Sequence, residues 1–227
     1  MGIMSFFVFF LRSFHLGEIS FFFLLLLVVA SGWIYDLIKE RFSGDFVETK
    51  ISTFFMGFVL MILSEILLFF SFFWAFFDFL NTIDIPYAIA PGGLPLLKTF
   101  LLLSRGVSVT LFHRCLFRGS KGFLYLIYTI FLGLFFECCQ IKEYRKRVLS
   151  ISSFTYGTTF FMLTGLHGFH VLIGIVCLLV LLYFVFNSYV NTLSLINSEC
   201  LIWYWHFVDI VWIFVYFFLY IFICFFG

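Results

Sequence analysis

The chain has 227 residues, of which 64% are hydrophobic and only 11% are charged, and its net charge is +1. A soluble domain carries about a quarter charged residues because its surface faces water. This composition therefore excludes an ordinary soluble protein and predicts a surface that faces the lipid bilayer. The near-neutral charge gives no electrostatic reason for a nucleic-acid partner.

Apolar stretches long enough to cross a bilayer recur along the chain. A spanning helix needs about 20 apolar residues, and six stretches reach or approach that length: residues 19–35, 51–79, 96–112, 122–141, 154–186 and 199–226. The apolar segment 2–11 is too short to span, so we expect a truncated or interfacial helix there. The sequence predicts an all-α polytopic membrane protein with six full transmembrane helices and a truncated N-terminal one.

The polar connections separate these helices without orienting them. All three prolines fall within residues 81–95, which marks a loop. The basic residues that flank the spans, with Lys98 counted among them, divide evenly between the two sides, so the positive-inside rule gives no orientation. No internal repeat is visible, which argues against a transporter built from paired halves.

The helix predicted over residues 51–79 carries one acidic residue near its centre, Glu65. A carboxyl at that depth is costly as an anion, so we expect it to be protonated, paired or facing a polar cleft. A structural hydrogen bond and a role in lipid contact or proton handling both remain open. Beside it, small or polar residues recur every seventh position, a spacing that lets another helix approach closely: Gly57, Ser64, Ser71 and Asp78.

The helix predicted over residues 96–112 has a similar stripe that ends at a histidine: Thr99, Leu103, Gly106, Thr110 and His113. Arg105 lies on another face, in the middle of the span. A buried guanidinium needs a counter-charge. Within this chain we expect Glu65 or Glu137 to supply it, with a lipid phosphate or another subunit as alternatives.

The helix predicted over residues 154–186 has a face that contains two histidines: Phe160, Leu163, His167, His170 and Gly174. Gly157, Thr164 and Gly168 form the adjacent stripe. Two histidines three positions apart suit a metal site, but the spacing supplies no third ligand. We therefore favour buried imidazoles that bond to neighbouring helices.

The helix predicted over residues 199–226 has two polar faces. One contains Glu199, Trp203 and His206, and the other contains Trp205, Asp209, Trp212 and Tyr216. His206 and Asp209 are three positions apart and within reach of a hydrogen bond. Such a pair suits proton relay, but we favour a neutralised structural pair.

Three long motifs in these helices resemble those of a known family. They are S-E-I-L-L-F-F-S-F-F-W-A-F-F at 64–77, Y-G-T-T-F-F-M-L-T-G-L-H-G-F-H-V-L-I-G at 156–174 and W-Y-W-H-F-V-D-I-V-W-I-F-V-Y at 203–216. Weaker matches lie at 95–113 and at Gln140-x-x-Glu143-Tyr144. In order and spacing, most of the chain from about residue 35 resembles the cytochrome c oxidase subunit III family.

The resemblance implies a seven-helix fold with two bundles. An N-terminal helix pair and matrix-side loop would occupy residues 1–50, and a five-helix bundle would occupy residues 51–227, with phospholipids in the cleft between them. Glu65 matches the family's buried reactive carboxyl, and Lys39 and Glu40 match a basic–acidic pair near lipid headgroups. The other polar positions of the motifs have structural roles: His113, His167, His170, Glu199, His206 and Asp209. Arg105 departs from the family, which has a small residue there.

The resemblance also implies a function and a location. The chain would be a multi-pass subunit of cytochrome c oxidase in the mitochondrial inner membrane, with no catalytic centre, metal or cofactor of its own beyond structural phospholipids. Haem and copper would lie in subunits I and II, and accessory subunits would complete the complex. The subunit would stabilise subunit I and support its proton uptake.

Two other classes of protein remain as alternatives. A dihaem carrier similar to cytochrome b needs four axial ligands in pairs, and the five histidines offer no two convincing pairs. A stand-alone transporter would show transport by the chain alone, and the missing repeat counts against it.

Overall fold

The computed structural model describes residues 48–80, 91–120, 122–146, 154–186 and 192–226, together with isolated positions between 21 and 39. The chain divides into two compact units, Met1–Met56 and Gly57–Gly227. The second unit contains every contact discussed below. The division expected after residue 50 stays a prediction.

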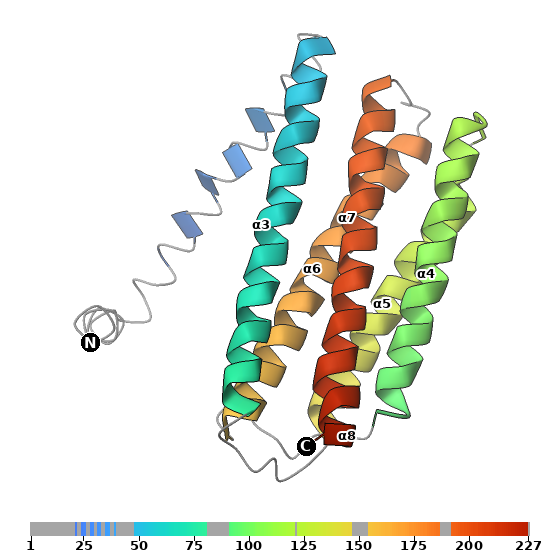
Figure 1. Cartoon of the computed structure of the whole chain (residues 1–227). Helices are drawn as coiled ribbons and strands as arrows, with labels where there is room; N and C mark the ends of the chain where they lie inside the picture. The colour runs from blue at the N-terminus through green and yellow to red at the C-terminus, as the bar shows by residue number, and fades with distance from the viewer. Residues whose placement is uncertain are drawn as a thin grey trace. The chain divides into compact units, whose positions relative to one another are not determined.

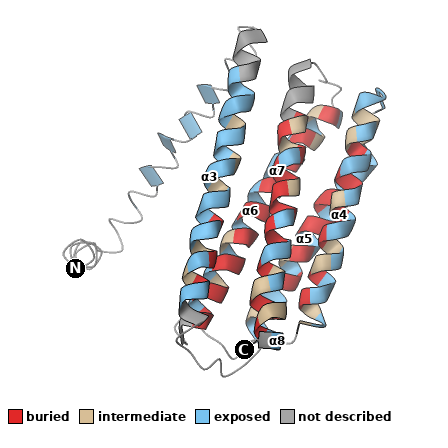
Figure 2. Ribbon diagram, in the orientation of Figure 1, coloured by how far each residue is buried: buried red, intermediate tan, exposed pale blue. Residues whose placement is uncertain are grey.

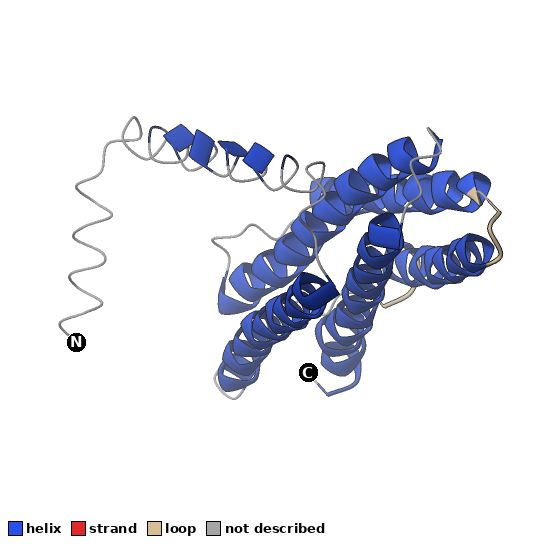
Figure 3. Cartoon of the chain, turned by 90° about the horizontal axis from the view of Figure 1, so that it is seen from above, coloured by secondary structure: helices blue, strands red, loops and turns tan. Residues whose placement is uncertain are grey.

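Long helices make up the described part of the chain (Figure 1). They are α3 (Glu48–Leu80), α4 (Leu94–Phe117), α5 (Phe123–Lys146), α6 (Phe154–Phe186) and α7 (Thr192–Tyr216), and α7 continues through a π-helical turn, η1 (Phe217–Phe222), into α8 (Ile223–Phe226). Five helical segments are long and apolar enough to cross a membrane. Five of the six predicted spans are therefore confirmed, and no strand occurs in the described segments (Figure 3).

The two predicted N-terminal segments lie mostly or wholly outside the residues that the structure describes. Segment 2–11 lies outside the described residues, and so does much of the predicted span 19–35. The described positions between 21 and 39 are helical and exposed. The number of full transmembrane helices beyond five stays a prediction.

Helices α4 to α7 close into a four-helix bundle. Contacts join α4 to α5, α5 to α6, α6 to α7 and α7 back to α4. The buried positions of these helices turn toward one another, whereas most of α3 is exposed (Figure 2). Large side chains fill the interior, and those fully buried include Phe112, Phe136, Phe160, Trp205 and Trp212. Since apolar side chains are also stable in lipid, the exposed apolar outer surface fits a membrane environment.

Glycine and proline set both ends of α4. Pro95 occupies the first turn, where a missing N–H costs nothing, and Gly93 precedes the helix with φ 78°. Beyond the helix, Gly119 and Gly122 have φ values of 72° and 52°. These left-handed conformations, which favour glycine, allow the short turn that reverses the chain into α5.

Helix α3 packs on α6 and α7 through a different face from its small-residue stripe. Phe69, Phe73 and Phe76 are buried, and Phe69 contacts the Phe207 ring with centroids 6.4 Å apart. The stripe residues are all exposed in the described structure: Gly57, Ser64, Ser71 and Asp78. The close helix contact expected at this stripe therefore stays a prediction.

Candidate functional site

Glu65 on α3 pairs with His170 on α6. Its Oε2 atom lies 2.9 Å from His170 Nε2, and His170 Nδ1 lies 2.8 Å from the carbonyl oxygen of Leu166. A carbonyl only accepts, so Nδ1 carries a proton and Nε2 faces the carboxyl. The pair then holds one shared proton, either on the carboxyl or on the imidazole. In both forms its net charge is zero, which suits a half-buried position within a membrane span.

Arg105 on α4 pairs with Asp209 on α7. Its Nε–H donates to Asp209 Oδ1 over 2.9 Å, and Nη2 lies 2.8 Å from the same oxygen without pointing at it. The guanidinium also lies over the rings of Trp205 and Phe136, 4.8 and 5.1 Å from their centroids. The prediction that Glu65 or Glu137 supplies the counter-charge of Arg105 is therefore wrong, because Asp209 supplies it.

Asp209 bonds across the bundle to α4 instead of along its own helix. Its side chain turns to the buried face of α7 with Trp205 and Trp212, as the sequence predicts for that face. His206 lies on the other face, where it lines a groove. The predicted hydrogen bond between His206 and Asp209 is therefore wrong, and Asp209 forms an ion pair with Arg105 instead. A buried guanidinium is always charged and needs a carboxylate, whereas an imidazole can stay neutral.

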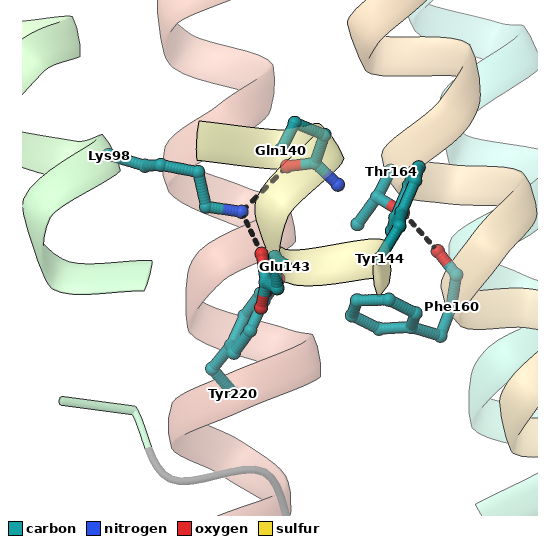
Figure 4. Close-up of polar contacts among 7 residues, drawn as sticks. All are labelled: Lys98, Gln140, Glu143, Tyr144, Phe160, Thr164 and Tyr220. Atoms are coloured by element: carbon teal, nitrogen blue, oxygen red, sulfur yellow. Dashed lines mark hydrogen bonds and ion pairs between the residues drawn. The ribbon is translucent and has the colours of Figure 1, made fainter. Parts of the chain in front are cut away.

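A second ion pair joins Lys98 on α4 to Glu143 on α5 (Figure 4). The Lys98 ammonium also donates to Gln140 Oε1 over 2.6 Å, and the Tyr220 hydroxyl donates to Glu143 Oε1 over 3.1 Å. The π-helical turn contains Tyr220, so three helical segments meet at one carboxylate. Lys98 is completely buried, with its ammonium 4.5 Å from the Trp212 ring centroid.

Neighbouring hydroxyl groups extend the contacts between helices. Tyr144 on α5 and Thr164 on α6 share a hydrogen bond of 2.7 Å, and Thr164 also donates to the Phe160 carbonyl (Figure 4). Ser108 on α4 and Thr129 on α5 share another of 2.7 Å. The predicted stripe that contains Thr164 and Gly168 is thus a buried contact surface of α6.

The remaining predicted histidines lie in different surroundings. His113 Nε2 lies 2.6 Å from Glu199 Oε1, and both side chains are about one-third exposed. His167 is completely buried, and the ring centroids of Phe136 and Trp212 lie 5.6 and 5.0 Å from its own. His170 bonds to Glu65, so the two histidines of α6 serve different neighbours. Within the described residues no group of three or more metal-ligating side chains occurs.

The two headgroup residues expected from the resemblance belong to the first unit. Lys39 is at an exposed helical position, and Glu40 lies outside the described residues. Their contact with lipid headgroups stays a prediction.

An apolar groove of about 700 Å³ lies between α3 and α7. Most of its lining is aromatic or branched aliphatic, and His206 is the one lining residue with an ionisable side chain: Ile62, Ile66, Phe69, Phe70, Phe73, Phe77, Trp203, His206, Phe207, Ile210, Val211, Phe214 and Phe218. Because the lining residues belong to membrane-spanning segments, the groove suits a hydrocarbon chain.

Sequence reasoning missed the cluster around Lys98 and Glu143. Hydropathy groups Lys98 with the charges that flank the spans, yet Lys98 is seven residues from Arg105 and lies on the same buried face of α4. Two cations on one face of a spanning helix indicate that this face meets carboxylates inside the protein. That spacing was the available signal.

Comparison with known proteins gives consistent matches along nearly the whole chain. A family model described as cytochrome c oxidase subunit III matches residues 1–224. The chain is 38% identical over 219 residues to cytochrome c oxidase subunit 3 of Pisaster ochraceus, covering 89% of this chain and 84% of that protein. It is 37% identical over 230 residues to the Allomyces macrogynus protein of the same name, covering 95% and 82%. Identity to the Rattus norvegicus protein is 40% over 201 residues, covering 81% and 76%.

Proposed function

Because the chain belongs to the cytochrome c oxidase subunit III family, we propose that it is a non-catalytic core subunit of mitochondrial cytochrome c oxidase in the inner membrane. The observation that carries this proposal is the family match over residues 1–224. The five membrane-spanning helices agree with it. In this role the chain binds subunits I and II, which hold the haem and copper, and contributes to electron transfer from cytochrome c to oxygen by stabilising the complex.

The polar contacts of the bundle support a stabilising role. Arg105, Lys98 and His170 each contact a carboxylate on another helix. Such pairs fix the relative positions of the helices, because breaking one leaves a charge in a medium of low polarity. The comparisons do not favour a transporter or a dihaem carrier. A dihaem carrier would also need histidines free to bind iron, whereas His113 and His170 bond to glutamates.

Bound phospholipids form a second part of the proposal. The apolar lining of the α3–α7 groove is compatible with an acyl chain, and its position within membrane spans exposes it to lipid. We propose that Lys39 and Glu40 contact lipid headgroups.

The Glu65–His170 pair is the candidate for proton handling near subunit I. A pair that holds one shared proton in a half-buried position can release and rebind it without a large change in structure. We expect Glu65→Gln to leave assembly intact, because the amide still bonds to His170, but to slow proton uptake and shorten the lifetime of the enzyme during turnover. Stopped-flow proton uptake and progress curves of oxygen consumption measure both. Wild-type values in both would make the carboxyl purely structural.

The function itself is tested by isolating the chain from mitochondrial membranes through an affinity tag. We expect haem and copper subunits to co-purify with it, and the reduced-minus-oxidised spectrum of haem to follow those subunits. The isolated chain should bind neither haem nor copper. Recovery of the chain without oxidase subunits, or with its own stoichiometric haem, would contradict the proposal.

A further inference from the structure

The outer side of α5 is apolar along most of its length and basic at its end. Side chains spaced three or four residues apart lie along this side of the helix: Phe131, Phe135, Cys138, Lys142 and Lys146. All of them are exposed in the described part of the chain. Because α5 is long and apolar enough to cross a membrane, this side faces lipid or another protein.

The apolar part of this side consists of two adjoining aromatic rings and their aliphatic neighbours. Phe131 is 61% exposed and Phe135 is 43% exposed, and their rings stack with centroids 6.5 Å apart. Leu134 and Ile141, both about half exposed, border the rings along the helix. A hydrocarbon chain that lies along such a surface gains dispersion contacts over its whole length.

Three cations continue the same side at the end of the span: Lys142, Arg145 and Lys146. Among the described residues no carboxylate forms an ion pair with any of them. The two acidic residues of α5 have other neighbours, since Glu143 pairs with Lys98 and the Glu137 carboxyl lies against Gly168 of α6. The basic end of α5 therefore has three positive charges without a counter-charge in the described structure.

The end of the helix itself balances only a small part of this charge. The free carbonyl groups of a helix C-terminus act as about half a negative charge, against three positive charges here. The position of the cations indicates where further negative charge comes from. Lys142 follows Phe131 by eleven residues, a rise of roughly 16 Å, and one leaflet of a bilayer has a hydrocarbon layer of about 15 Å. The apolar surface thus matches one acyl chain, with the cations at the level of its headgroup.

We propose that this side of α5 binds a phospholipid with an anionic headgroup. Its phosphate pairs with Lys142 and Lys146, and its acyl chain lies along Phe135 and Phe131. A zwitterionic headgroup binds more weakly, because its own ammonium group is repelled by the cations. This site is separate from the α3–α7 groove, whose lining contains no residue of α5. It depends on α5 spanning the membrane, and not on which subunits surround the chain.

Two double variants of the purified complex that contains this chain test the role of charge. Lys142→Gln/Lys146→Gln removes two positive charges, and Lys142→Arg/Lys146→Arg keeps them. Native mass spectrometry measures binding of dioleoyl phosphatidylglycerol and of dioleoyl phosphatidylcholine, which has the same acyl chains but no net charge. We expect the Gln variant to raise the apparent Kd for phosphatidylglycerol about 25-fold, because each cation near a membrane surface contributes about 1 kcal/mol, a factor of about five. The Arg variant should bind phosphatidylglycerol as the wild type does, and phosphatidylcholine binding should not depend on the variant.

Unchanged phosphatidylglycerol binding by the Gln variant would overturn the proposal, and so would an equal loss in the Arg variant, because neither result depends on charge. Both lysines are exposed, so we expect both variants to assemble. Should the Gln variant fail to do so, a structure of the wild-type complex with its lipids resolved decides. We expect a headgroup phosphate within about 4 Å of the Lys142 or Lys146 nitrogen and an acyl chain against Phe131. A transmembrane helix of another subunit over Phe131 and Phe135 would overturn the proposal and identify this side of α5 as a protein interface.

Discussion

At the scale of single residues, the interior of this bundle is unusual in holding two cations. Arg105 and Lys98 are completely buried, and each meets a carboxylate on a different helix, Asp209 on α7 and Glu143 on α5. Aromatic rings of Trp205 and Trp212 lie beside the charged groups. The rings add cation–π attraction, which is strongest where water is absent. The two ion pairs thus join α4 to both of its neighbours.

The Arg105–Asp209 pair yields a prediction about stability. Arg105→Met leaves the Asp209 carboxylate buried without its counter-charge, and we expect a cost of about 3 to 5 kcal/mol. The double variant Arg105→Met/Asp209→Leu removes both charges and should recover most of that loss. The measurement is the temperature at which heat releases this chain from the purified complex.

The His113–Glu199 pair supplies the control. Both side chains are about one-third exposed, so Glu199→Gln should cost no more than about 1 kcal/mol. If the double variant at positions 105 and 209 were as unstable as Arg105→Met, the carboxylate of Asp209 would not be the cause of the loss.

The sequence predicts which polar side chains need a partner, because residue type alone sets that need. It does not predict which residue the partner is. Glu65 was expected to be paired or to face a polar cleft, and its bond to His170 agrees with that. The predicted partner of Arg105 is wrong, because Asp209 is distant in sequence and three carboxylates compete for the guanidinium. Choosing among them needs the register of α7 against α4, which no local pattern contains.

At the scale of elements, the close contact between α6 and α7 depends on a glycine. A Cβ atom on Gly174 would lie 2.7 Å from Trp205 Cε3, and the Trp205 ring is completely buried and cannot move outward. Small residues allow such close approach between membrane helices. The sequence spacing groups Gly174 with His167 and His170 on one face of this helix, and all three are buried.

Gly174→Ala should therefore force α6 and α7 apart. Overpacking of this kind costs about 1 to 3 kcal/mol, so we expect this chain to be lost from the complex at lower temperature and in milder detergent than in the wild type. Gly165→Ala on the same helix should be tolerated, because its methyl group meets only the Tyr144 hydroxyl at 3.9 Å. Equal behaviour of the two variants would show that the α6–α7 contact can adjust.

The small-residue stripes of α3 and α4 show where pattern reasoning at this scale is limited. Gly57, Ser64 and Ser71 are exposed, and α4 turns Lys98 and Arg105 inward in place of Thr110. In a soluble helix the apolar side marks the core. In a membrane helix both sides are apolar, so hydropathy does not separate the inner from the outer face. Ionisable residues mark the inner face better, because they avoid lipid.

At the scale of the whole molecule, the number and order of the described spans were predictable because bilayer thickness fixes their length. Their arrangement was not, because it depends on pairs between distant residues such as Lys98 and Glu143. The groove between α3 and α7 is a consequence of that arrangement. Phe69 and Phe73 of α3 line it together with residues of α7, and neither helix alone has a sequence pattern that predicts it.

The proposed acyl chain in this groove can be tested with two tryptophan variants. Ile210 lines the groove and Ile213 does not, although both are about half exposed. An indole at position 210 occupies space that a hydrocarbon chain would fill, whereas at position 213 it adds similar bulk outside the groove. We expect native mass spectrometry of the purified complex to find fewer bound phospholipids with Ile210→Trp than with Ile213→Trp. Because the bundle core lies elsewhere, both variants should keep this chain in the complex. Equal phospholipid content would mean that the groove is covered by protein, since only a protein neighbour would keep lipid out of an apolar surface within the membrane.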